Sequence, residues 1–242
     1  MNDLEELGTD FERVLAVVAH PDDVETGASA AIAQWTDAGK TVTYLLLTRG
    51  EAGIDGLDPT QCAPLREAEQ IAASKIVGVD VVEFLDHRDG TIEPTIELRR
   101  DIAAAIRRHR PHLVVTLNHH DTWPGGGGWN TPDHRHTGRA VLDAVGDAAN
   151  RWLFPEQLID GLEPWNGVAR VAIAASPFAT HAVAVEGGLE RSIASLQAHA
   201  TYNAGLGQTD EDIRTFLTAN AAANRDRFGG RLCTAFEVVR FH

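Results

Sequence analysis

The chain has 242 residues, 43% of them hydrophobic, which is enough for one sizeable core. A single domain over 1–242 is therefore expected, in which 1–12 form an N-terminal extension. The 35 acidic and 21 basic residues give a formal net charge of −14, which argues against a broad electrostatic grip on nucleic acid or anionic lipid. A small-molecule partner is expected instead, and the sequence leaves open whether the protein forms a homo-oligomer.

Cysteine usage and the N-terminal residues bear on the cellular compartment. Cys62 and Cys233 cannot form a disulfide framework and lack the CxxC spacing of redox or zinc-ribbon sites. The acidic first residues have no apolar signal-peptide core, and no stretch approaches about 18 uninterrupted apolar residues. We therefore expect a cytoplasmic protein without a membrane span.

Short apolar runs alternate with helical patterns along the chain. The expected strands cover 14–19, 41–47, 79–85, 112–117 and 168–175, and the expected helices cover 24–38, 64–77, 95–109 and 134–150. This alternation predicts βαβ units, hence a Rossmann-like, three-layer, doubly wound α/β fold with a mostly parallel sheet. Strands at 181–186 and 232–241 and helices at 188–203 and 209–226 predict an added C-terminal layer, not a second domain.

Two segments rich in histidine and aspartate follow the first and fourth of these strands. "AHPDD" at 19–23 follows the first strand, and "LNHHDTWPGGGGWNTPDHRHTGRA" at 117–140 follows the fourth. In the common 3-2-1-4-5 strand order these two strands are neighbours at the switch point, where ligands bind outside the carboxyl ends. The two segments are therefore expected to meet in one crevice.

The spacing of these residues is typical of an open catalytic zinc site. His20 and Asp23 stand three apart where strand gives way to helix, so both side chains can face one centre while Asp22 points elsewhere. His134 or His136 would supply the third ligand, which leaves one position for a water whose pKa the metal lowers. Asp22, beside the metal but not bound to it, is then positioned to take a proton from that water.

Purely structural roles are open for the same residues. Asp22 or Asp23 could cap the helix that follows, and Asp133 could cap the helix at 134–150. His134 and His136 could be solvated helix residues. The sequence lacks GxxxxGK[ST], a GxGxxG turn after the first strand and GxSxG, which disfavours a nucleotide-binding domain and the usual serine hydrolase.

"AHPDD" and "PDHRHTGRA" together resemble the zinc-dependent de-N-acetylases of the PIG-L/LmbE family, which act on N-acetylglucosamine conjugates. "LLLTRGEAG" at 45–53 and the segments 65–90 and 195–203 are similar to the remaining family segments, in the same order, so the resemblance covers most of 13–203. It implies a bound Zn²⁺ or another divalent metal. The ligands implied are His20, Asp23 and His134, with Asp22 as the general base.

The resemblance also implies substrate contacts by Arg66 and Asp89. Each has a structural alternative. Arg66 could be a solvated helix arginine that pairs with Glu67 or Glu69, and Asp89 in "DHRDG" could be only a turn residue.

One departure from the family pattern affects the mechanism. Many family members have histidine where this chain has Thr131, and that histidine is credited with stabilising the oxyanion or protonating the leaving amine. Thr131 can give the substrate a hydrogen bond but cannot supply a proton at neutral pH. The candidates for the missing acid are His120, His136 and His199; we favour His199, whose segment resembles the family's HxSQ, over His120. The alternative for His199 is a helix-surface histidine.

The expected function is that of a zinc hydrolase that removes an acetyl or other acyl group from the amine of an N-acylated amino sugar or sugar conjugate. Two alternatives remain. The first is a zinc amidase that acts on a non-sugar amide, such as a secondary metabolite. The second is a binder of sugar conjugates that keeps the metal but has lost turnover, which Thr131 makes conceivable.

Overall fold

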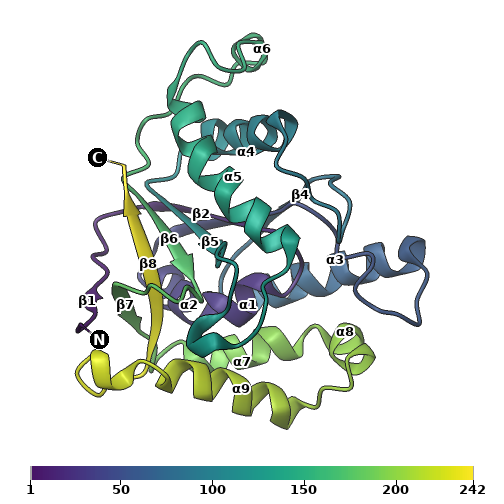
Figure 1. Ribbon diagram of the computed structural model, residues 1–242, viewed down its shortest axis with the longest axis vertical. Helices are drawn as coiled ribbons and strands as arrows, with labels where there is room; N and C mark the ends of the chain where they lie inside the picture. Colours follow the sequence, from purple (N-terminus) through teal and green to yellow (C-terminus); the bar gives the residue numbers. More distant parts are fainter. Residues whose placement is uncertain (1, 242) are drawn as a thin grey trace.

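One eight-stranded sheet runs through the middle of the protein, as seen in a computed structural model that describes residues 2–241 (Figure 1). In sheet order the strands are β1 (Glu5–Glu6), β7 (His181–Ala184), β8 (Cys233–Arg240), β6 (Arg170–Ala174), β5 (Leu113–Leu117), β2 (Arg13–Val18), β3 (Thr41–Leu46) and β4 (Val81–Phe84). Only β8 runs antiparallel to its neighbours. The predicted mostly parallel α/β sheet is confirmed. Its five predicted strands take the expected order, β4-β3-β2-β5-β6.

Helices cover both faces of this sheet (Figure 1). α4 (Ile96–His109) and α5 (Pro132–Ala149) pack on one face, and α1 (Asp23–Gly27) and α2 (Ser29–Asp37) pack on the other. Successive side chains of a strand point to opposite faces, so a strand covered on both sides is apolar throughout. In β2, for example, Val14, Ala16 and Val18 belong to one buried cluster and Leu15 and Val17 to the other.

The C-terminal part of the chain forms a further layer beside α1 and α2. It contains α7 (Leu189–Gln197), α8 (Ala200–Gly205) and α9 (Asp210–Ala222), with α3 (Pro59–Ile76) packed against α7 and α8. The expectation of one helix over 188–203 is wrong, because the chain breaks between α7 and α8 at His199, whose side chain is turned into the core. α9 packs against α7 and β8.

The remaining elements are short. α6 (Glu156–Ile159) stands out from the body of the protein (Figure 1), and two single turns of 3-10 helix cover Pro124–Gly126 and Arg225–Arg227. Glu5 and Glu6, within the N-terminal extension, add an edge strand beside β7. Among residues 2–241, none of the helices combines the length and apolar character needed to cross a membrane.

Candidate metal centre and active site

The two His/Asp segments lie side by side because β2 and β5 are paired in the sheet. At the end of β2 the chain turns sharply through Asp22, which has a φ of 89°, in the left-handed region that non-glycine residues seldom adopt. Such backbone strain persists where the surrounding structure requires a particular side-chain direction. Asp22 makes no capping hydrogen bond to α1, so the capping alternative for this residue is wrong.

Asp23, the first residue of α1, directs its carboxylate back towards the end of β2. Its Oδ2 accepts hydrogen bonds from the backbone N–H groups of Ala19 at 3.0 Å and His20 at 2.9 Å. Its Oδ1 lies 3.1 Å from Nε2 of His134, at the start of α5. The carboxylate is thus fixed by the strand end and faces an imidazole from the other segment, so the capping alternative is wrong for Asp23 too.

The hydrogen bonds of Asn130 define which nitrogen of His134 carries a proton. The Nδ2 of Asn130 donates to the carbonyl oxygens of Asn118 at 2.7 Å and His120 at 3.0 Å, so its Oδ1 is the acceptor. His134 Nδ1 lies 3.0 Å from that Oδ1 and must donate to it. His134 Nε2 therefore faces the Asp23 carboxylate, and a proton or a metal ion between the two atoms would satisfy both.

His20 is oriented in the same way by two carboxylates. Its Nε2 lies 3.1 Å from both Asp89 Oδ1 and Asp133 Oδ2, while its Nδ1 lies 3.6 Å from Asp23 Oδ2. A proton on Nε2 is shared with Asp89 and Asp133, so Nδ1 is the nitrogen that faces Asp23 and that loss of its proton would free for a metal. Carboxylates placed behind a ligating histidine fix its tautomer and strengthen it as a ligand.

Asp133 holds this position because it is not the cap of α5, and the capping alternative is wrong here as well. Thr131 is the N-cap and accepts a hydrogen bond from the N–H of His134 at 3.3 Å. Asp133 is buried and accepts hydrogen bonds from the backbone N–H groups of Gly90 at 2.8 Å and Ile92 at 3.0 Å. It therefore ties α5 to the loop after β4.

These three side chains form a donor set that fits a divalent metal. Ligand atoms of His20, Asp23 and His134 all lie within 4.8 Å of one another, and two nitrogens with one carboxylate oxygen are donors typical of zinc. A second, overlapping group consists of His20, Asp89 and Asp133. The oxygens of Asp89 and Asp133 already accept N–H groups, so this second group supports the first.

The protonation states of the cluster also indicate a cation site. Burial raises the pKa of Asp23, but His134 and His20 outweigh it and hold that pKa well below its usual range. Burial lowers the pKa of His20, but hydrogen bonds to Asp133, Asp23 and Asp89 outweigh it and raise that pKa well above its usual value. Without a metal, the cluster retains positive charge as a proton.

Asp22 has the properties of a general base. Its Oδ1 accepts a hydrogen bond from Arg66 Nη2 at 2.9 Å, and its N–H donates to Gln70 Oε1 at 3.0 Å. Burial raises the pKa of Asp22 to about 6, although the Arg66 charge opposes the shift. A carboxyl group with a pKa close to neutrality can both accept and return a proton near pH 7.

Arg66 lies in α3 beneath this carboxylate and is buried, so the alternative of a solvated surface arginine is wrong. Its Nη1 donates to the carbonyl oxygen of Gly50 at 2.9 Å. A Cβ atom at Gly50 or Gly53 would lie 2.0 or 2.4 Å from Nη1, so a side chain at either position would displace the guanidinium group from Asp22. The prediction that Arg66 contacts substrate stays a prediction; in this structure its partners are Asp22 and backbone carbonyls.

Tyr202, at the start of α8, is a site residue that the sequence reasoning missed. Its ring lies 3.7 Å from the guanidinium carbon of Arg66, and it borders the same hollow as Asp22. Burial and the Asp22 charge raise the pKa of Tyr202 to about 12, so its hydroxyl stays protonated. The signal was present in "AHATYN", where an aromatic residue follows the favoured histidine.

The favoured acid candidate, His199, is completely buried, so the helix-surface alternative is wrong. Its Nε2 lies 3.6 Å from Glu25 Oε2. Burial lowers the pKa of His199, but Glu25 outweighs it and the pKa is raised. His199 lies outside the linings of both cavities that reach Asp22.

The two other candidate histidines point to different partners. His120 Nε2 lies 2.7 Å from Glu237 Oε2, on β8, and His136 Nδ1 lies 2.6 Å from the carbonyl oxygen of Ile92. Neither belongs to the donor set around Asp23. Of the two histidines considered as third ligand, the structure thus brings His134 to His20 and Asp23.

Replacing Asn130 with alanine should weaken zinc binding about 10- to 100-fold, because the tautomer of His134 would no longer be fixed. Competition with a chromophoric chelator measures the dissociation constant. Asn150→Ala, at the other end of α5, is the matched control and should bind zinc as the wild type does. Equal zinc affinity in Asn130→Ala would show that Asn130 does not orient the ligand.

The fold is Rossmann-like, and a cluster of carboxylates and imidazoles lies at the carboxyl ends of its strands. The protein is therefore an α/β protein with a candidate metal site at that edge of the sheet. The sequence pattern of one family, described as PIG-L: GlcNAc-PI de-N-acetylase, matches residues 15–145. The chain belongs to the PIG-L family, as the resemblance implied.

Curated relatives carry deacetylase names. A diacetylchitobiose deacetylase from Thermococcus kodakarensis is 36% identical over 157 residues, which cover 64% of this chain and 57% of the relative. A 1D-myo-inositol 2-acetamido-2-deoxy-alpha-D-glucopyranoside deacetylase from Kineococcus radiotolerans is 32% identical over 196 residues, which cover 66% of this chain and 50% of the relative. The chain thus spans between 50% and 57% of the length of these two relatives.

Solved structures share the fold over almost the whole chain. The N,N'-diacetylchitobiose deacetylase of Pyrococcus horikoshii has a TM-score of 0.84 at 24% identity and covers 96% of this chain and 85% of its own. The conserved protein TT1542 from Thermus thermophilus has a TM-score of 0.74 at 26% identity, with 92% of each chain covered. The C-terminal layer is therefore part of the shared fold.

Proposed function

We propose that the protein is a zinc-dependent hydrolase that removes an acetyl or other acyl group from the amine of an N-acylated amino sugar or sugar conjugate. The deacetylase names of its relatives support this activity. The observation that carries the proposal is the position of Asp22, a carboxyl group with a pKa of about 6, directly beside the His20, Asp23 and His134 cluster. A small N-acylated substrate and a cytoplasmic location are part of the same proposal.

His20, Asp23 and His134 would hold the metal, with His20 using Nδ1 and His134 using Nε2. A bound zinc ion supplies Lewis acidity and lowers the pKa of water towards about 7. The protein contributes the alignment of the donors, because Asn130 and Asp133 fix the two imidazole tautomers. Three protein ligands are the number that catalytic zinc sites typically have.

Asp22 takes the proton from the attacking water and later gives it to the departing amine. Arg66 holds Oδ1 of this carboxylate at 2.9 Å, which leaves Oδ2 for proton transfer. If Asp22 carries out both proton transfers, hydrolysis does not need the histidine that many family members have at the position of Thr131. His199 and His120 remain predicted acids, but His199 is completely buried and lines neither cavity, and His120 contacts Glu237.

Tyr202 and Thr131 are the neutral side chains that we propose as hydrogen-bond donors to the substrate, at or near its carbonyl oxygen. The Tyr202 hydroxyl stays protonated, and the Arg66 guanidinium against its ring keeps the side chain beside Asp22. A donor placed where negative charge develops lowers the barrier without transferring a proton. Thr131 is exposed at the start of α5, next to His134. Asp89 contacts His20 and so helps to orient this ligand. Its contact with the substrate remains a further part of the proposal.

Acetate release from N-acetylglucosamine and N,N'-diacetylchitobiose tests the proposal. We expect hydrolysis that a chelator abolishes and zinc restores. Binding of these sugars without any hydrolysis would favour the non-catalytic binder. Hydrolysis of non-sugar amides alone would favour the amidase.

Zinc affinity should rise with pH by about tenfold per unit around neutrality. The pKa of His20 is raised well above its usual value, so metal-free protein keeps this imidazole protonated and zinc must displace one proton. Lower pH therefore favours the metal-free form. Chelator competition at several pH values measures the slope, and a dissociation constant that does not change with pH would contradict this assignment.

A further inference from the structure

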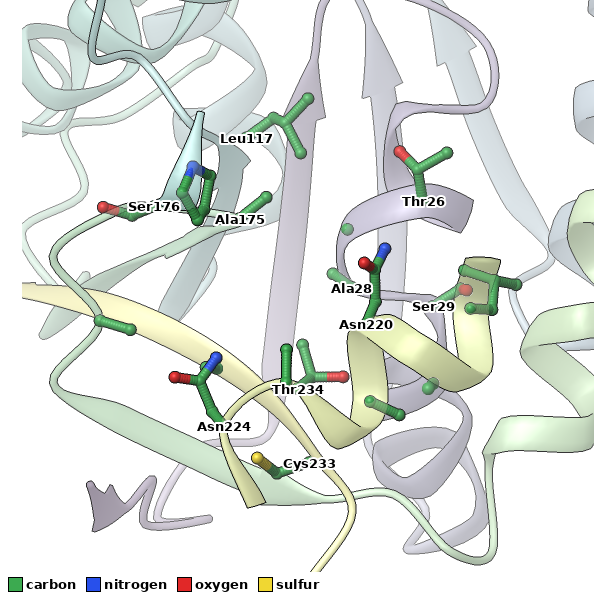
Figure 2. A pocket seen from close by; sticks show the side chains of 18 of the residues that line it. Thr26, Ala28, Ser29, Leu117, Ala175, Ser176, Asn220, Asn224, Cys233 and Thr234 are labelled. Carbon is green, nitrogen blue, oxygen red and sulfur yellow. The ribbon is translucent and has the colours of Figure 1, made fainter. Parts of the chain in front are cut away.

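A large cavity opens from the catalytic cluster and extends away from it. It begins at Asp22, Asp23 and His134. From there it passes Ala28 and Ser29 at the start of α2 and continues between α9 and β8, where Asn220 and Thr234 lie (Figure 2). Its volume is about 810 Å³, within the range of about 300–1,000 Å³ in which proteins hold drug-sized ligands. An acetyl group would fill only a small part of this space.

The walls of this cavity are mostly apolar, and many of the side chains that line it are small. Figure 2 shows Ala28, Leu117 and Ala175 around it, and Gly27, Ala221 and Ala235 complete this part of the lining. A Cβ atom at Gly27 would lie 2.7 Å from Leu117 Cδ1, so the wall is closely packed even with glycine there.

Polar groups in the outer part of the cavity are few and offer no free charge. Asn220, Asn224 and Thr234 lie along α9, the chain after it and β8 (Figure 2). The one cationic lining residue of this part, Arg227, already donates to the carbonyl oxygens of Asn2 and Ala179 and to the side chain of Asn224. The cavity therefore favours an uncharged, apolar group with a few polar contacts.

A second, smaller cavity shares Asp22, Thr26 and Phe216 with the first, so the two cavities meet beside the proposed base. Its volume is about 270 Å³. Side chains that can bind hydroxyl groups line it: Tyr202, Asn203, Gln208 and Asp212. Apolar side chains line it as well: Leu196, Leu206, Ile213 and Phe216. The two cavities thus differ in size, and α9 contributes to both.

An amide is planar and almost always trans, so its acyl and amine substituents leave the C–N bond in opposite directions. We infer that the larger cavity holds the acyl half of the substrate, an apolar chain longer than acetyl, and that the polar amine half lies in the smaller cavity. The inference rests on the proposed function and names its substrate class: N-acylated amino sugars with medium-length or long acyl chains.

A series of acyl chains tests this with the zinc-loaded enzyme. We compare kcat/KM for N-acetyl-, N-butanoyl- and N-octanoylglucosamine. Full burial of one methylene contributes about fourfold, and half of that free energy contributes about twofold. Over the six additional methylenes of octanoyl, the twofold factor predicts that octanoyl exceeds acetyl by about 50-fold. Acetyl hydrolysed as fast as octanoyl would overturn the inference and leave the proposed function intact. Failure to hydrolyse any of the three would count against both. A preference for octyl N-acetylglucosaminide over N-octanoylglucosamine would place the aglycone in the cavity and overturn the acyl assignment.

Thr234→Phe narrows the outer part of the cavity with a residue that strands accommodate well. We expect the octanoyl-to-acetyl ratio of kcat/KM to fall at least about tenfold. Thr41→Phe, on the exposed first residue of β3, is the matched control and should leave the ratio unchanged. An unchanged ratio in a folded Thr234→Phe protein would contradict the acyl assignment.

Discussion

Replacing Asp22 with asparagine should lower kcat by about a thousandfold while the zinc content stays at the wild-type level. Asparagine keeps the shape of the side chain and can still accept the Arg66 hydrogen bond, but it cannot take a proton. Loss of a general acid or base typically costs about 10²- to 10⁴-fold, and the proposed residue serves in both roles. Steady-state kinetics together with metal analysis of the same preparation measure the two quantities.

Asp143→Asn is the control for this substitution, because Asp143 is an exposed aspartate of α5, far along the helix from His134. It should behave as the wild type does. Full activity in Asp22→Asn would refute the base assignment. Loss of zinc together with activity would instead indicate that Asp22 is a metal ligand.

Replacing His134 with alanine should abolish stoichiometric zinc binding and, with it, activity. The substitution removes one of three donors and leaves the Asp23 carboxylate with only His20 as a nearby imidazole. Metal analysis after dialysis against a weak chelator gives the readout, with circular dichroism to show that α5 still folds. We expect less than about one tenth of the wild-type zinc content, since an open zinc site depends on all three ligands.

His136→Ala is the matched control, two residues further along α5. Its imidazole contacts the carbonyl oxygen of Ile92 and lies outside the donor set. It should retain zinc. The opposite result, with zinc kept in His134→Ala and lost in His136→Ala, would exchange the roles of the two histidines.

The sheet and the donor set could be predicted because both depend on local patterns. Continuous apolar runs mark strands buried on both faces, and the alternation with helices implies the order that places β2 beside β5. Once those strands are neighbours, His20, Asp23 and His134 are close together.

The groups behind the ligands could not be predicted, because their partners are far away in the chain. Asp133 next to a helix start suggests a cap, and only the approach of the loop at Gly90 and Ile92 gives its carboxylate other donors. Asn130 orients His134 only because the loop after β5 folds back on itself.

The burial of charged side chains could not be predicted from the sequence either. Arg66 lies in a helical segment with several charged residues, which suggests a solvated side chain. In the structure it lies on the buried face of α3 and contacts Asp22. His199 is buried because the chain breaks between α7 and α8, and no glycine or proline marks that break. The larger cavity depends on α9 and β8, which lie outside the matched residues 15–145.

Anomalous diffraction at the zinc edge from crystals of the zinc-loaded protein tests the central claim, that two adjacent aspartates have different roles. We predict one peak bonded to His20 Nδ1, Asp23 and His134 Nε2, with Asp22 uncoordinated and still paired with Arg66. A peak bonded to His20 Nε2, Asp89 and Asp133, or one that includes Asp22 among its ligands, would contradict the account.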